Sequence, residues 1–280
     1  MADRTPLDRF KQALTATARA VSRDPEVEVA WSADAPSASG SNFRVPLPGR
    51  TLPRDQASEA RGFADSFALK LRHHNAALHA RAAPAEPTAR ACYDVVEQVR
   101  YEALGANNFS GMRDNLEAAT ELRTATDPIT RAQVEGEVPL QSALGLLLRE
   151  ALTGAPIPQR ARGGVEMVRE FIEARTGGDF EALALSIDDQ KAFQSLALDM
   201  LQHLELTRTD ESGSSDEDDG DADDGQDEAD DDGEDQQDGA EPQTAEMAGE
   251  PAQGDSDGDS DGESQDSEEM SDGDVGEEGE

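Results

Sequence analysis

Residues 55–83 read DQASEARGFADSFALKLRHHNAALHARAA and carry the strongest helical signal in the chain. Pro84 and Pro87 follow directly, and proline cannot continue a helix. We therefore predict one helix over 55–83. Its apolar residues recur at helical spacing on one narrow face, and they are Ala60, Phe63, Phe67, Leu71 and Leu78.

Helical periodicity continues on both sides of this stretch. Thr5 and Pro6 supply a cap and a first turn for the earliest helix, and Gly105 is a plausible stop for the helix after Pro87. In that later helix we expect an inward stripe of Cys92, Val95, Val96, Val99 and Ala103. The further predicted helices cover 4–23, 88–104, 109–124, 138–153, 162–175, 179–187 and 189–206.

Two short runs alternate polar and apolar residues, as half-buried strands do. They lie at 26–31 and 42–45, and the Ser-, Ala- and Gly-rich loop 32–42 separates them. We predict that they pair as a β-hairpin with a long loop. The expected fold class is therefore mainly α, a helical N-terminal domain with one small β-hairpin, followed by a disordered acidic tail.

The charge divides the chain into two parts. The chain has 24 Lys and Arg, all before position 209, and 62 Asp and Glu, of which 33 lie in 210–280. The first part therefore has a net charge of −5 and the second −33. A segment so charged and so poor in apolar residues cannot offset its ordering entropy by burial. We predict a helical domain over 1–209 and a disordered acidic low-complexity tail over 210–280.

The same composition excludes several classes of protein. A surface this acidic repels nucleic acid and anionic lipid. No apolar run approaches the roughly 20 residues that a membrane span needs, and the N-terminus lacks the apolar core of a secretory signal. The three lysines, Lys11, Lys70 and Lys191, do not follow a glycine, so there is no phosphate-binding P-loop. We expect a soluble cytoplasmic protein.

Three histidines and the single cysteine invite a metal or catalytic interpretation. His73, His74 and His79 are one, five and six residues apart, whereas two metal ligands on a helix are three or four apart. On a continuous helix their rings diverge, so we expect His74 at the core or its rim and the other two on the solvated surface. Cys92 lies at an apolar position and is typical of a small core residue; a nucleophile paired with a histidine is the distant alternative.

Two metal-loop patterns occur in the acidic tail. Asp257, Asp259, Asp261, Gly262 and Glu268 match the calcium loop of EF-hands. The flanks have no amphipathic helices, so we interpret the match as chance. The D-x-S-x-S pattern over 210–214 matches the metal loop of von Willebrand A-type domains, but nothing after it is expected to fold. The tail itself is expected to be a solvating linker, with weak cation collection or docking on a basic partner as the alternative.

Several stretches, in order, resemble the amino-terminal region of the T subunit (CobT) of aerobic cobaltochelatase. They are ADSFALKLRHHNAALH (64–79), VEQVRYEALG (96–105), LREALTG (148–154) and IDDQKAF (187–193), followed by a helix that runs into a long acidic tract. The resemblance covers essentially all of 1–209. The family's carboxy-terminal von Willebrand A-type domain has no counterpart here, so we expect either a fragment or a truncated member.

The resemblance implies a non-catalytic adaptor of the ATP-dependent complex that inserts Co²⁺ into hydrogenobyrinic acid a,c-diamide. The implied partners are an AAA+ ATPase subunit and a large chelatase subunit, in a ring-shaped oligomer. The complex uses ATP, Mg²⁺ and Co²⁺, and the resemblance assigns this chain no cofactor, no metal ligand and no catalytic residue. The whole complex belongs to the ligase class.

Arg100 and Glu102 are the candidate partner-binding residues, because they lie outside the Val95 and Val99 stripe. The alternative for both is a local ion pair or a solvated face. For the whole chain, the rival function is an acidic-tailed chaperone or binding module for basic proteins. In that case the tail acts as the polyanion and the helical domain 1–209, the head, dimerises. A hydrolase built on Cys92 and a histidine is a third hypothesis.

Overall fold

The computed structural model describes residues 5–207, and within this range it contains nine α-helices, three short strands and three single-turn 3-10 helices. The mainly α fold class is confirmed. Thr5 caps the first helix as predicted, because its hydroxyl accepts the backbone N–H of Asp8 while the Asp8 carboxylate accepts that of Thr5. The α-helices are α1 (Pro6–Ser22), α2 (Arg54–His73), α3 (Ala76–Ala82), α4 (Pro87–Asn108), α5 (Ser110–Ala125), α6 (Leu140–Thr153), α7 (Arg162–Thr176), α8 (Asp179–Leu185) and α9 (Gln190–His203).

The strands form a mixed sheet in the order β1-β3-β2, where β1 is Glu28–Ser32, β2 is Ser37–Ser39 and β3 is Asn42–Pro46. β1 runs parallel to β3, and β2 is antiparallel to it. The expected hairpin between the runs 26–31 and 42–45 is therefore wrong. The chain reverses once after β1 and again at Gly40, whose φ is +54°, so it returns in its original direction. A hairpin does form, but between β2 and β3.

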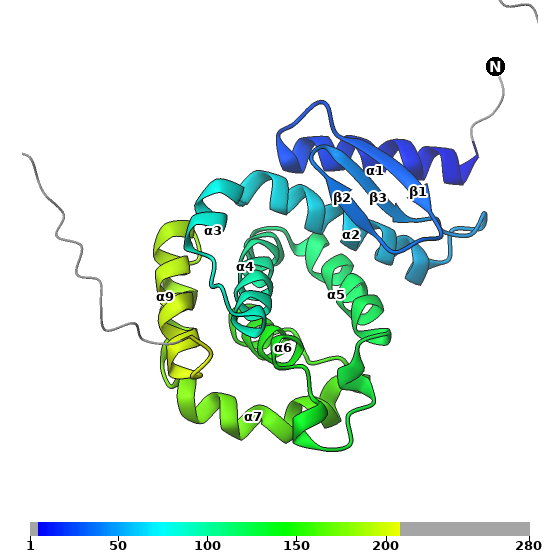
Figure 1. The fold of residues 1–280 in the computed structure, drawn as a ribbon. Helices are drawn as coiled ribbons and strands as arrows, with labels where there is room; N and C mark the ends of the chain where they lie inside the picture. Colours follow the sequence, from blue (N-terminus) through cyan, green and yellow to red (C-terminus); the bar gives the residue numbers. More distant parts are fainter. Residues whose placement is uncertain (1–4, 208–280) are drawn as a thin grey trace, which may run out of the picture. The chain divides into compact units, whose positions relative to one another are not determined.

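One face of the sheet packs on α1 and α2 (Figure 1). Phe43 and Val45 of β3 are buried, whereas Asn42 and Arg44 are exposed, which is the alternation expected of a strand with one covered face. Burying two such side chains stabilises the fold by about 1.5–3 kcal/mol each. Phe43 meets Phe67 of α2 edge to face, with ring centroids 5.6 Å apart.

The predicted helix over 55–83 is two helices. His74 is extended, with φ −110° and ψ 119°, and Asn75 then caps α3 by accepting the backbone N–H of Leu78 at 3.0 Å. Asparagine side chains compete with the helical backbone for hydrogen bonds and favour such caps. The side chain of Gln190, at the start of α9, accepts the backbone N–H of Asn75 at 2.7 Å. A contact 115 residues away in sequence thus fixes the break.

α4 occupies the centre of the helical part and contacts α2, α5, α6 and α9 (Figure 1). Its predicted stop at Gly105 is wrong, since α4 continues to Asn108. A Cβ at Gly105 would lie 2.3 Å from Cδ1 of Leu69, so this glycine lets α2 and α4 approach each other. The largest apolar cluster lies where α4 meets α6, α7, α8 and α9, and it includes Leu144, Leu148, Ile172, Leu183, Phe193 and Met200.

No helix within residues 5–207 is long and apolar enough to cross a membrane. The predicted tail, with its two metal-loop patterns, lies outside the described residues, and the predicted boundary at 209 and 210 falls there too.

Candidate functional site

Arg100 lies inside the fold and holds three segments together. Its side chain is 1% exposed and forms a bidentate ion pair with Glu97, one turn earlier on α4, with Nε to Oε2 and Nη2 to Oε1 both at 2.8 Å. It also donates from Nη1 to the backbone oxygen of Ile187 at 3.1 Å and from Nη2 to that of His73. The guanidinium therefore joins α4 to the end of α2 and to the turn before α9.

Burial and hydrogen bonding act in opposite directions on Glu97. Desolvation raises its pKa, but hydrogen bonds from Arg100 and His74, together with the charge of Arg100, outweigh it, and the pKa lies below its ordinary value. The carboxylate is thus ionised at neutral pH and partners the buried cation.

Glu102 forms a second buried network. Its Oε1 accepts from Ser66 Oγ of α2 at 2.6 Å, Gln98 Nε2 at 3.0 Å and Arg123 Nη2 of α5 at 2.8 Å. One carboxylate oxygen therefore ties α2, α4 and α5 together.

The partner-facing orientation expected of Arg100 and Glu102 is not observed. Their exposed fractions are 1% and 7%, because α4 is buried on every face over 99–106 rather than on one stripe. Arg100 forms the local ion pair of the alternative interpretation, whereas Glu102 pairs with Arg123 of another helix.

The break between α2 and α3 brings two histidines together. The ring centroids of His74 and His79 are 4.9 Å apart, so the divergence predicted for a continuous helix is wrong. His74 pairs with Glu97 at 2.8 Å and His79 with Asp94 at 2.7 Å. His74 lies at the rim, as expected, whereas His79 is only 9% exposed and is not a surface residue.

Burial lowers the pKa of His79, although its hydrogen bond to Asp94 acts against this effect. Burial also lowers the pKa of His73, which is half-buried, and the nearby arginine charges add to the effect. Within residues 5–207, no three His, Cys, Asp or Glu side chains are placed to hold a metal ion together.

Cys92 is buried, and desolvation raises the pKa of its thiol to about 12. A thiol of this kind is almost entirely protonated at neutral pH, whereas the thiolate is the nucleophile. The interpretation of Cys92 as a core residue agrees with these observations.

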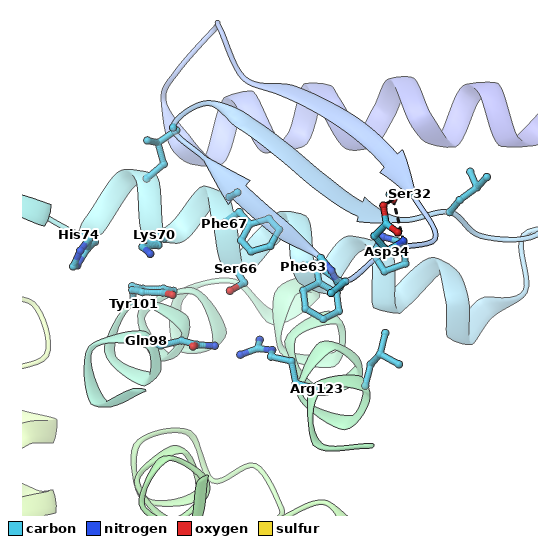
Figure 2. A pocket seen from close by; sticks show the side chains of 18 of the residues that line it. Ser32, Asp34, Phe63, Ser66, Phe67, Lys70, His74, Gln98, Tyr101 and Arg123 are labelled. Atoms are coloured by element: carbon cyan, nitrogen blue, oxygen red, sulfur yellow. Dashed lines mark hydrogen bonds between the residues drawn. The ribbon is translucent and has the colours of Figure 1, made fainter. Parts of the chain in front are cut away.

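A cleft of about 980 Å³ lies between the loop after β1 and the helices α2, α4 and α5 (Figure 2). Its floor is a stripe of α2 at helical spacing, and the loop 32–40 with Leu47 forms one wall. From α4 come Gln98 and Tyr101, and from α5 come Leu122, Arg123 and Thr126. The residues of the α2 stripe are Phe63, Ser66, Phe67, Lys70, Leu71 and His74.

Polar groups gather at one end of this cleft. In Figure 2, Lys70 and His74 project from α2 beside Tyr101, and the side chains of Gln98 and Arg123 point toward each other beneath Ser66. A second hollow of about 430 Å³ shares Lys70, His74, Gln98 and Tyr101, and its lining also includes acidic residues of α4. Burial raises the pKa of Tyr101 far above its ordinary value, so its hydroxyl stays protonated.

Two cations of the cleft have unused hydrogen-bonding capacity. Lys70 is exposed, and its ammonium has no ion pair or hydrogen bond within the described part of the chain. Arg123 donates from Nη2 to Glu102, but its buried Nε has no acceptor. The lining also includes an acid on the opposite wall, Asp34, which accepts a hydrogen bond from Ser32 at 2.8 Å.

Sequence reasoning missed this cleft. It assigned Phe63, Phe67 and Leu71 to one core stripe, but Phe63 is buried whereas Leu71 is 37% exposed and lines the cleft. A signal existed in the sequence, since Ser66 and Lys70 lie on the same face as Phe63 and Phe67. A stripe that mixes apolar, hydroxyl and cationic side chains is unusual for a buried helix face.

One of the comparisons with known proteins identifies a family. A family model described as cobalamin biosynthesis protein CobT matches residues 4–279 of this chain. No solved structure matches the chain.

Proposed function

Because the chain belongs to the CobT family of cobalamin biosynthesis proteins, we propose that it is a non-catalytic assembly subunit of an ATP-dependent cobaltochelatase. The family match over residues 4–279 is the observation that carries this proposal. In this role the chain assembles with an AAA+ ATPase subunit and a large chelatase subunit in a ring-shaped, cytoplasmic complex. Co²⁺ is the substrate, hydrogenobyrinic acid a,c-diamide receives it, and the ATPase subunit uses ATP and Mg²⁺.

The chemistry of the described side chains supports an adaptor rather than a catalyst. The Cys92 thiol is buried and protonated at neutral pH. His74 and His79 are paired with carboxylates of α4. The thiol and these two imidazoles are thus buried or paired within the described part of the chain.

The buried ionic networks support transmission of force through the head. Arg100 links α4 to the end of α2 and to the turn before α9, while Glu102 links α4 to α2 and α5. Elements joined by buried charge-assisted hydrogen bonds move together. A partner that pushes on one of these helices therefore displaces the others as one body.

The acidic segment 210–280 serves as a tether in this proposal. Its net charge is −33, and the length of a linker sets the effective concentration of the modules that it joins.

Reconstitution tests the proposal. The full chain, the ATPase subunit and the large subunit are mixed with ATP, Mg²⁺, Co²⁺ and the corrin, and metal insertion is followed by absorbance. We expect insertion only with all three proteins, and co-purification of the ATPase subunit with the tagged chain. Insertion at an undiminished rate without this chain would contradict the proposal.

Two variants test the non-catalytic part. Cys92→Ala removes the thiol with a small change in volume, and His203→Gln removes the exposed histidine that pairs with Asp179 at 2.8 Å. Both complexes should insert Co²⁺ at nearly the wild-type rate. Loss of turnover in either one, with assembly intact, would show that the side chain takes part in the chemistry.

The second candidate function, a chaperone for basic proteins, is favoured by the polyanionic segment alone. It requires binding to a panel of cationic proteins that falls steeply as salt rises. Such binding by the isolated segment 210–280, without any effect of the chain on Co²⁺ insertion, would replace the proposal with this one.

A further inference from the structure

We propose that the cleft between the loop 32–40 and helices α2, α4 and α5 binds a small organic carboxylate with a bulky apolar body. The inference does not depend on the assembly role, since it concerns the isolated chain. It follows from three features of the cleft, which are its size, its exposed apolar wall and the unpaired ammonium of Lys70 at one end.

The cleft has the dimensions and the rigidity of a ligand site. Its volume of about 980 Å³ is at the upper end of the roughly 300–1,000 Å³ that small-molecule pockets span. Its three helices are held by the hydrogen bonds that Ser66, Gln98 and Arg123 donate to Glu102. The walls are therefore fixed before any ligand arrives, which lowers the entropic cost of binding.

Large apolar side chains line the cleft and stay in contact with water. Leu47 is 52% exposed and Leu71 is 37% exposed, and the cleft is also lined by the partly buried Phe67 and the buried Phe63, whose ring centroids are 6.2 Å apart. Covering such a surface is favourable by roughly 25 cal/mol per Å². The wall thus favours a broad apolar or aromatic body.

The polar end favours an anion. Glu102 and Arg123 neutralise each other, so Lys70 leaves this end with an excess positive charge. Arg123 Nε also has no acceptor in the described part of the chain, but it is out of contact with solvent, so Lys70 is the donor that a ligand in the cleft can reach. A ligand acceptor beside Lys70 gains a hydrogen bond to a charged group, and Tyr101 and Gln98 lie at the same end of the cleft (Figure 2).

A carboxylate suits this end better than a phosphate. The excess charge is a single ammonium, and the carboxylates of Glu97 and Glu102 lie on the adjacent α4. A phosphate dianion would bring a second negative charge that no further unpaired cation of this end offsets. One carboxylate matches one unpaired lysine.

A matched pair of fluorescent probes tests the proposal on the full chain. Pyrenebutyrate carries a carboxylate on a flat apolar body, and pyrenebutanol carries the same body without charge. We expect saturable one-to-one binding of pyrenebutyrate, measured by fluorescence anisotropy, and weaker binding of pyrenebutanol. Added salt should weaken only the binding of the acid.

Three variants locate the site. Lys70→Gln should weaken pyrenebutyrate about tenfold and change pyrenebutanol less than about twofold, since a hydrogen bond to a charged group is lost in only one case. Leu71→Asn should weaken both probes. Lys191→Gln, an exposed lysine on α9 that is no part of the cleft, should change neither. Circular dichroism confirms that each variant is folded, and none of these positions is buried.

Three results would overturn the proposal. The first is the absence of saturable binding of pyrenebutyrate. The second is binding that neither Lys70→Gln nor Leu71→Asn affects. The third is displacement of the probe by an acidic peptide as effectively as by unlabelled small aryl carboxylates, which would assign the cleft to a protein segment instead.

Discussion

Asp65 is a buried carboxyl group whose replacement tests the packing of α2 on α5. It is 3% exposed, and its Oδ2 accepts a hydrogen bond from Asn115 Nδ2 at 2.8 Å. Burial raises its pKa to about 6 from an ordinary value of 3.8, although the bond from Asn115 and the charge of Arg61 act in the opposite direction. Asp65→Asn places a neutral amide where the protonated carboxyl fits.

The pKa difference gives the size and sign of the effect. Below the unfolded-state pKa both states are protonated, so ionisation of Asp65 has no effect on stability. As the pH rises from about 4 to about 6 the unfolded state loses its proton first, and the folded state is progressively destabilised. Above the folded pKa of about 6 the loss is complete, and at 1.36 kcal/mol per pKa unit it amounts to about 3 kcal/mol.

Chemical denaturation of the full chain, followed by circular dichroism, measures this effect. The gain in unfolding free energy on Asp65→Asn should be about 2 kcal/mol larger at pH 8 than at pH 4.5. Asp114→Asn, an exposed position on α5, is the control and should show no such difference. An equal effect of Asp65→Asn at both pH values would refute the assignment of Asp65 as a carboxyl destabilised by burial.

Three further substitutions or reactions follow from the packing. A Cβ on residue 62 would lie 1.9 Å from the backbone oxygen of Asn115. Gly62→Ala should therefore lower the free energy of unfolding, measured by thermal denaturation, by about 3 kcal/mol. Gly111→Ala is the control and should not lower it, because a Cβ there has nothing within 4 Å. Because burial raises its pKa to about 12, the Cys92 thiol should react with a disulfide reagent only after denaturant unfolds the chain, and fast reaction of the native protein would contradict its burial. Arg100→Met leaves its carboxylate partner buried without a cation and should cost about 3–5 kcal/mol in denaturant, and a change below about 1 kcal/mol would show that the pair is solvated.

The sequence was sufficient where local signals and packing agree. The cap at Thr5 with Pro6 and the apolar spacing of α6 predicted both helices closely, since short-range chemistry decides them. The sequence was insufficient to predict the fold where a contact between residues far apart in the chain determines the local structure. The break at Asn75 depends on Gln190, and the parallel pairing of β1 with β3 depends on a second chain reversal at Gly40.

The candidate site was harder to predict for a related reason. A helix with one apolar stripe is expected to expose its other faces, so Arg100 and Glu102 were placed on the surface. In the fold, four other helices surround α4, and polar residues of its remaining faces are buried as pairs. Ion pairs between different helices leave no repeating pattern in the sequence, so they could not be predicted from it. Only Glu97 and Arg100, at a spacing of three, offered a local signal.

The buried pairs of α4 connect the stability of the head to the shape of its cleft. Replacing an ion pair by apolar residues is often neutral or stabilising, so stability alone does not explain why charges stay inside a helical core. The pairs fix the relative positions of the helices, because hydrogen bonds are directional. A single oxygen of Glu102 accepts from Ser66 and Arg123 on two different helices. Apolar packing at that point would let α2 and α5 slide along α4, whereas the hydrogen bonds fix their register. The cleft between these helices, with Arg123 held at its polar end, then keeps one geometry.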